Sequence, residues 1–154
     1  MLSGLSGLVA WHPWIYPALT VLHLIGLGTL FGGLLILDLR LLGRASTLDP
    51  VTLARLAVPV ALAGFALCLV TGGLMFAAHA DEVWASRAFR VKLVLILIAG
   101  LNALWFHRRV ALGRTGSPGP RGEAVPDRLA RAQGLLSLAL WIAVIACGRW
   151  IGVA

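Results

Sequence analysis

The chain has 154 residues, of which 60% are hydrophobic and only 12% are charged, and its formal net charge is +7. Soluble domains carry charges on about a quarter of their residues, so this composition excludes an ordinary soluble fold. The positive charge does not indicate nucleic-acid binding, because the basic residues flank apolar runs and form no amphipathic basic face. The length leaves room for one membrane domain only.

Four apolar runs without Asp, Glu, Lys or Arg occupy residues 13–37, 56–80, 93–107 and 132–148. A helix needs about 20 mostly apolar residues to cross a hydrocarbon core of about 30 Å. The first two runs reach this length, and the last two do so if Arg90, Lys92 and Arg149 extend toward the interface. The sequence therefore predicts an all-α integral membrane four-helix bundle, one domain over residues 1–154, with helices at about 13–42, 51–80, 86–109 and 126–153.

Basic residues are divided unequally between the two ends of this predicted bundle. Four lie at the end that holds the termini, and nine lie at the end that holds the first and third connections: Arg40, Arg44, Arg55, Arg108, Arg109, Arg114, Arg121, Arg128 and Arg131. Connections rich in Lys and Arg stay in the cytoplasm. The sequence thus predicts a multi-pass protein of the bacterial inner (plasma) membrane, with a cytoplasmic loop at 110–125 and both termini on the outer, periplasmic side.

Several ionisable side chains gather toward the predicted outer end. His23 lies well inside the first span, where an ionisable group is costly and therefore suggests a function. We expect it to bind a cofactor or metal, with an interhelical hydrogen bond as the alternative. Lys92 and Arg149 either serve the same site, for instance by pairing with haem propionates, or extend to the interface. Met75 and His79 are four residues apart on one helix face, a spacing that suits a soft copper site.

Two glycines and an asparagine complete the candidate site. Gly26 and Gly33 share the helix face of His23 and predict space for a flat group such as a porphyrin; the alternative is close helix packing. Asn102 and His107 fall toward the cytoplasmic end. Asp38 lies near the same end, and a structural ion pair with the nearby Arg40 is expected.

The first and third spans resemble two related membrane families, the copper-resistance D (CopD) type and the HemJ type of protoporphyrinogen oxidase. The resemblance rests on His23-Leu-Ile-Gly-Leu-Gly-Thr-Leu-Phe-Gly-Gly-Leu-Leu34 and on Ala88-Phe-Arg-Val-Lys-Leu-Val-Leu95. Asn102 matches an asparagine late in the third helix of the copper-resistance type. The chain as a whole resembles small bacterial membrane proteins of unknown function in this group.

The HemJ resemblance implies b-type haem held by a first-helix histidine and a third-helix lysine, here His23 and Lys92. The copper-resistance resemblance implies copper uptake or tolerance. The chain is shorter and has fewer polar residues than the HemJ type, so the enzymatic activity is not carried over. It also has neither the extra helices nor the periplasmic copper-binding domain of the copper-resistance type.

Three functional hypotheses follow. The first is haem b bound between the first and third helices in the outer half of the bilayer, with Lys92 or His79 as second ligand and electron transfer to a redox partner or quinone. The second is copper handling by His12, Met75 and His79. The third is a cofactor-free structural or assembly subunit. All three place the protein in the lipid bilayer, and a binding or electron-transfer protein is expected rather than an enzyme; a homodimer or larger membrane complex is compatible with each.

Overall fold

The computed structural model describes residues 14–44, 48, 50–112, 116–118 and 124–151. Within this part of the chain, four long helices account for most residues: α2 (Ile15–Leu41), α3 (Pro50–Ala78), α5 (Arg87–Ala111) and α6 (Arg128–Ile151). They contain 24 to 29 residues, and even 24 residues rise about 36 Å. All four are long and apolar enough to cross a membrane, which confirms the predicted fold class.

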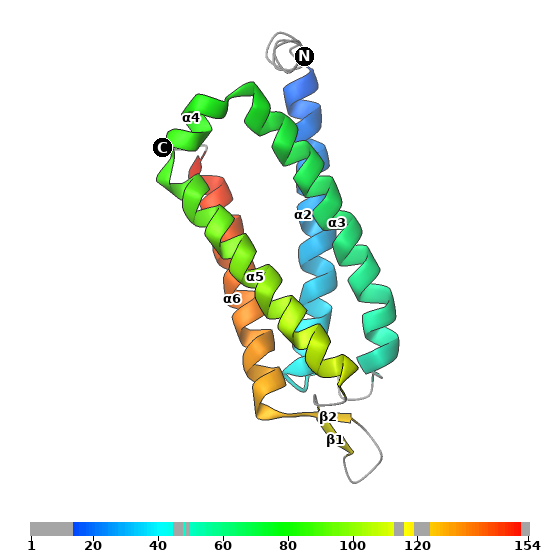
Figure 1. Cartoon of the computed structure of the whole chain (residues 1–154). Coiled ribbons are helices and arrows are strands. Elements are labelled where there is room, and N and C mark those ends of the chain that lie inside the picture. Colours follow the sequence, from blue (N-terminus) through cyan, green and yellow to red (C-terminus); the bar gives the residue numbers. More distant parts are fainter. Residues whose placement is uncertain (1–13, 45–47, 49, 113–115, 119–123, 152–154) are drawn as a thin grey trace.

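Short elements occupy the connections. Helix α4 (Ala80–Ala85) lies between α3 and α5, and the strands β1 (Gly116–Pro118) and β2 (Ala124–Pro126) precede α6. The strands pair antiparallel, with Gly116 opposite Pro126. The sequence predicted only a loop here. The two strands were not predicted, because strands of three residues between Gly and Pro show no alternating apolar pattern. We call the two ends of the bundle the α4 end and the hairpin end (Figure 1).

The long helices pack as two antiparallel pairs. Helix α2 lies along α3, α5 lies along α6, and the pairs are joined by contact between α2 and α6. Figure 1 shows α2 starting and α6 ending at the α4 end. Along the outer faces, large apolar side chains such as Leu24, Leu69 and Leu97 are exposed on the isolated chain. In a bilayer these faces contact lipid or a further membrane-embedded chain.

Small residues bring α2 and α3 into close contact. A Cβ atom added at Gly64 would lie 2.5 Å from the Leu30 nitrogen and 2.6 Å from the Gly26 oxygen, while one at Gly33 would lie 3.0 Å from the Ala57 oxygen. The distances at Gly64 are too short for any side chain, and the distance at Gly33 is tighter than nearly all real Cβ contacts. Gly26 and Gly33 therefore lie against α3, as the packing alternative for these glycines predicted. The space beside them is filled by the neighbouring helix, so the expectation that they make room for a porphyrin is not met.

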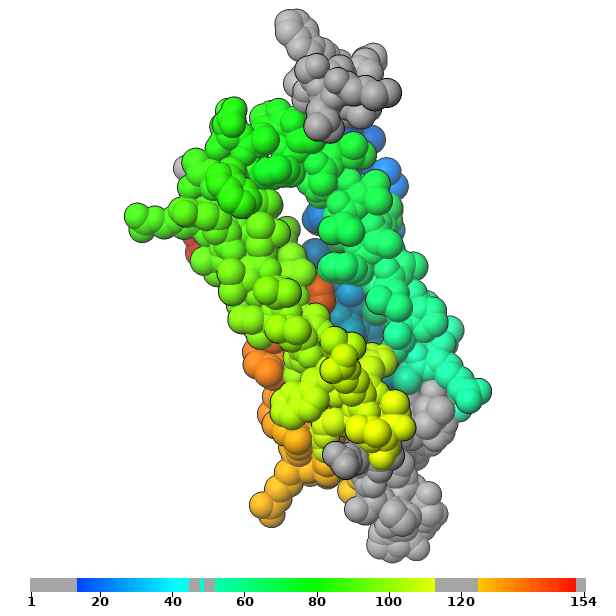
Figure 2. Space-filling model, viewed as in Figure 1, coloured from blue at the N-terminus to red at the C-terminus, as the bar shows by residue number. Residues whose placement is uncertain are grey.

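Helices α3 and α5 meet near the α4 end through aromatic rings. Phe76 of α3 stacks on Phe89 of α5 with ring centroids 5.2 Å apart, and Trp84 of α4 packs edge-on against both rings. Beyond this cluster the two helices separate. Figure 2 shows the surface hollowed between α3 and α5 below α4, with atoms of α2 and α6 visible behind. We call this space the hollow.

Candidate functional site

His23 lies between α2 and α3 in the half of the bundle nearer α4. Its Nδ1 atom is 2.9 Å from the Thr71 hydroxyl oxygen. A Cβ atom at Gly72 would lie 3.1 Å from His23 Cε1, so the imidazole ring rests against this glycine. Thr71 is 2% exposed, and the histidine is half-buried. The pair therefore holds the ring in one orientation within the apolar span.

The hydrogen bonds of Thr71 determine which nitrogen of His23 carries the proton. The Thr71 hydroxyl lies 2.7 Å from the Leu67 carbonyl oxygen, to which it donates. A hydroxyl has one proton to donate, so it accepts from Nδ1–H of His23. Nε2 then carries a lone pair, so it is the ring nitrogen that could bind a metal. A histidine with Nδ1–H held and Nε2 free is arranged as a metal ligand.

Lys92 of α5 lies on the other side of the hollow. Its Nζ atom is 3.6 Å from the position of a Cβ added at Gly148 of α6, so the ammonium group lies over that glycine. Electrostatic interactions link Lys92 with His23 and with Cys68 and Cys147. Each of the four long helices thus contributes one chemically reactive side chain to this region: His23, Cys68, Lys92 and Cys147.

Aromatic rings lie above and below this group along the bundle. Phe65 of α3 packs edge-on against Trp141 of α6, with ring centroids 6.4 Å apart. Phe76 begins the aromatic cluster at the α4 end, and it follows Phe65 by 11 residues, which is about 16 Å along the helix. His23 and Lys92 therefore lie in an apolar layer that aromatic rings bound on both sides.

The structure separates Asn102 and His107 from this layer, whereas Arg149 lies beside it. Asn102 is buried near the hairpin end, where its side-chain nitrogen donates to the Gln133 carbonyl oxygen at 3.1 Å. His107 lies close to it in sequence and is exposed, within 2.8 Å of the Ala103 oxygen. Arg149 is exposed one residue beyond Gly148, near the α4 end.

The residues proposed for copper are held in separate contacts between α2 and α3. The Thr20 hydroxyl, which donates to the Tyr16 carbonyl oxygen, lies 3.8 Å from the Met75 sulfur, and the exposed His79 ring packs edge-on against Tyr16 at 5.7 Å. His12 lies outside the described residues. Among the described residues, no three His, Cys, Asp or Glu side chains gather as a metal site would require.

The expected ion pair between Asp38 and Arg40 does not form. Side chains two residues apart on a helix point to different faces. Asp38 faces α6, where its carboxyl group lies near Ser137, whereas Arg40 Nε donates to the Leu48 oxygen at 2.7 Å. Arg109 instead pairs with Asp127 across the α5–α6 connection.

Sequence reasoning missed Thr71 and Gly72. They are 48 and 49 residues after His23, and only the register between α2 and α3 brings them to its ring. A threonine followed by a glycine inside an apolar span was the available signal, because a hydroxyl in lipid needs a partner and glycine leaves room for one.

The fold defines a multi-pass helical membrane protein with polar side chains inside its apolar spans. The chain belongs to a family of unknown function, DUF6644, which matches residues 12–154. No curated protein and no solved structure matches the chain.

Proposed function

We propose that this protein holds a b-type haem in the hollow, with His23 as an axial ligand, and serves in membrane electron transfer. The observation that carries the proposal is the bond from His23 Nδ1–H to Thr71, which leaves Nε2 available to iron. Haem iron is commonly held by histidine, and the partner of the second ring nitrogen tunes the ligand. A buried threonine that already donates elsewhere is such a partner.

The resemblance to the HemJ type supports the same assignment. It associates haem with a first-helix histidine and a third-helix lysine, which correspond to His23 of α2 and Lys92 of α5, and the charge of Lys92 acts on His23. Lys92 would be the second axial ligand or would pair with a propionate. His79 is less suited to be the second ligand, because it lies beyond the end of α3, eight residues after Thr71, and packs on Tyr16.

The protein's contribution would be ligation, burial and control of charge. Bound haem supplies one-electron redox chemistry at its iron. The aromatic layers of the hollow keep water away, and the Lys92 and Arg149 cations favour an anionic group nearby. One haem near one end cannot carry electrons across a core of about 30 Å. A quinone or a partner subunit would therefore exchange electrons with it.

Copper handling is less well supported than haem. A small metal ion needs several protein ligands that converge, whereas haem iron needs only one or two. Met75 and His79 each have a packing partner on α2, and the described residues hold no group of three acidic, histidine or cysteine ligands.

The test is the visible spectrum of the detergent-purified protein, made with ample haem, oxidised and then dithionite-reduced. We expect a Soret band with sharp reduced α and β bands. His23→Ala should abolish it, and His107→Ala, a change at an exposed histidine near the other end, should leave it intact. A featureless wild-type spectrum, or equal haem retention in both variants, would refute the haem proposal and favour a cofactor-free subunit.

The Thr71 bond gives a finer prediction. Thr71→Val removes the acceptor of His23 Nδ1–H while conserving shape, so the haem should remain but its reduction potential and reduced spectrum should shift. Thr71→Ser restores the hydroxyl and should behave as wild type. Redox titration of the two variants measures the difference; identical potentials in Thr71→Val and wild type would show that the bond does not tune a ligand.

A further inference from the structure

A second polar group lies buried in the half of the bundle near the hairpin end. It consists of Asp38 on α2, Asn102 on α5, and Gln133 and Ser137 on α6, and we call it the Asp38 cluster. Asp38, Asn102 and Gln133 are 5%, 8% and 3% exposed. Ser137 follows Gln133 by one helical turn, so both lie on the same face of α6. Nothing in the proposed haem site uses these side chains.

All three of these deeply buried side chains have an atom without a hydrogen-bond partner. In the described part of the chain, the buried unpaired atoms are Asp38 Oδ2, Asn102 Oδ1 and Gln133 Nε2. An unpaired buried polar atom is costly, and each one in a native structure calls for an explanation. One side-chain atom of each residue therefore remains for a ligand that the amino acids alone do not supply.

Contacts with a single turn of α6 bring these residues together. Asn102 Nδ2 donates to the Gln133 carbonyl oxygen. The Asp38 carboxyl group lies near Ser137, and the Asp38 backbone oxygen would be 3.4 Å from a Cβ added at Gly134. Both α2 and α5 thus place a polar side chain on residues 133–137. The absence of a Cβ at Gly134 is what lets α2 approach so closely.

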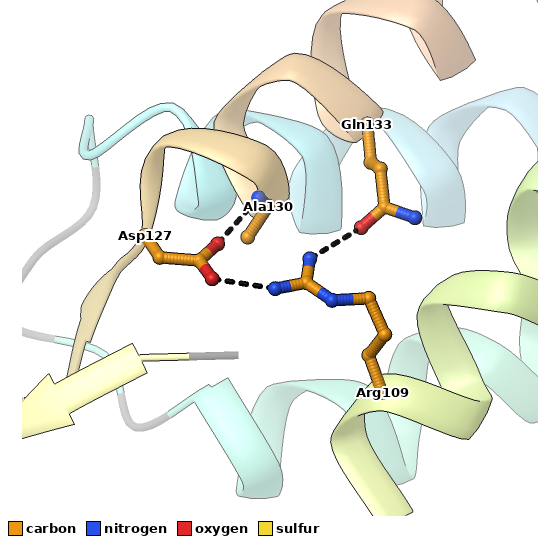
Figure 3. Close-up of polar contacts among 4 residues, drawn as sticks. All are labelled: Arg109, Asp127, Ala130 and Gln133. Atoms are coloured by element: carbon orange, nitrogen blue, oxygen red, sulfur yellow. Dashed lines mark hydrogen bonds and ion pairs between the residues drawn. The ribbon is translucent and has the colours of Figure 1, made fainter. Parts of the chain in front are cut away.

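The orientation of the Gln133 side chain is fixed. Its Oε1 atom accepts from Arg109 at 3.0 Å, and Arg109 is in turn paired with Asp127. A guanidinium has only donors, so the amide cannot be flipped without losing this bond. Figure 3 shows the amide nitrogen pointing away from Arg109. Nε2 is therefore a donor that faces the interior.

The unpaired atoms match both protonation states of Asp38. An ionised carboxylate only accepts, and Gln133 Nε2 offers it a donor, directly or through a buried water. A protonated carboxyl also donates, and Asn102 Oδ1 offers it an acceptor. The Ser137 hydroxyl can act as a hydrogen-bond partner of the carboxyl group in either protonation state. The cluster thus holds one unused partner for each form of the acid.

We propose that Asp38 is a proton-binding site, which takes up and releases a proton between the membrane interior and the solution at the hairpin end. Asp38 is three residues from the end of α2, about 5 Å of helix rise, so a chain of one or two waters would be long enough to connect it to that solution. This inference does not depend on haem. It gives the protein a proton-accepting group in the half of the bundle opposite His23.

The charged side chains on the helices around Asp38 all point elsewhere or are paired with other residues. On α2, Arg40 turns to the Leu48 carbonyl. From α5, Arg109 lies behind Gln133 and is paired with Asp127. On α3, Arg55 is exposed. The residues of α6 that face Asp38, Gln133 and Ser137, do not titrate, so the acid exchanges its proton with water.

Infrared spectroscopy of the whole protein over a pH series tests the proposal. We expect a carbonyl band of a protonated carboxyl that appears and disappears reversibly with pH. Asp38→Asn should remove that band, while Asp81→Asn, a change at an exposed acid of α4, should keep it. A titration unaffected by Asp38→Asn would overturn the proposal.

A pair of variants that retain Asp38 makes the test independent of the folding of Asp38→Asn. Asn102→Leu removes the acceptor for the protonated form and should lower the midpoint of the band's titration. Gln133→Leu removes the donor for the ionised form and should raise it. Each shift should be about one pH unit, the effect of one hydrogen bond. Shifts in the same direction, or none in folded variants, would show a purely structural cluster.

Discussion

At the residue scale, Asp127 shows how one side chain secures the start of a helix. Its carboxylate accepts from the Ala130 backbone N–H at 2.6 Å and pairs with Arg109 of α5 (Figure 3). It therefore caps α6 and ties α5 to it at the same point. The hydrogen bond from the Ala130 N–H makes the largest contribution, and Arg109 a smaller one, to holding the pKa of this carboxyl below its usual value of 3.8.

We predict that Asp127→Ala destabilises the protein by about 1 kcal/mol, the usual cost of losing a helix cap. Asp127→Asn keeps the cap but loses the ion pair, so it should cost less. Thermal unfolding followed by helicity measures both effects. Equal stability of Asp127→Ala and wild type would mean that the cap and the ion pair contribute nothing in the membrane protein.

The same residue predicts a pH dependence with a definite sign. A carboxyl with a lower pKa in the folded state contributes stability above its unfolded pKa, about 3.9, and loses it as pH falls through the folded value. Wild type should therefore lose some stability below about pH 4. Asp127→Asn should lack this part of the loss, and an unchanged acid profile would contradict the prediction.

Single residues also show where sequence reasoning ends. His23 was identifiable because an ionisable group inside an apolar run is unusual. Its partner Thr71 was not, because the partner depends on the register between two helices. Asp38 was predicted to form an ion pair with the nearby Arg40. Side chains two residues apart on a helix point to different faces, and Asp38 faces α6 instead.

At the element scale, the contact between α2 and α3 depends on positions that tolerate no side chain. We predict that Gly64→Ala destabilises the protein by about 1–3 kcal/mol, the usual cost of overpacking. The added Cβ would meet backbone atoms of Leu30 and Gly26, which cannot rotate away.

Gly28→Ala is the matched control, because a Cβ there meets nothing within 4 Å. It should be neutral or slightly stabilising, since alanine favours a helix more than glycine does. Thermal or denaturant unfolding in detergent compares the two variants. Equal effects would show that the close contact at Gly64 is not needed for stability.

The helices themselves were predictable from the sequence, because long runs without charged residues have no other stable form in lipid. The sequence predicted that glycines of α2 allow close helix packing, but not which of them contact α3. Gly26, Gly28, Gly32 and Gly33 look alike in the sequence, and the structure places Gly26 and Gly33 against α3 while Gly28 and Gly32 have open space. The side of a helix that meets its neighbour depends on the whole bundle.

At the scale of the whole molecule, the arrangement allows the orientation in the membrane to be tested. The starts and ends of the four spans place β1 and β2 at one end and α4 at the other (Figure 1). The distribution of basic residues predicts that the hairpin end is cytoplasmic. A reporter enzyme that works only in the cytoplasm should be active when it is inserted at Gly116. A reporter enzyme that works only outside the cytoplasm should be active when it is fused to the C-terminus. The opposite labelling would reverse the sides assigned to His23 and Asp38.

The pairing of helices has a consequence for how the protein is made. Helix α2 finds its main partner in α3, the next long helix, and α5 finds its partner in α6. Such local contacts form before distant ones, since little chain must be ordered first. Each pair can thus enter the bilayer as a helical hairpin soon after its second helix leaves the ribosome. Docking of α6 on α2 then completes assembly and creates the hollow, so the proposed haem site comes into being only after the last span has been inserted.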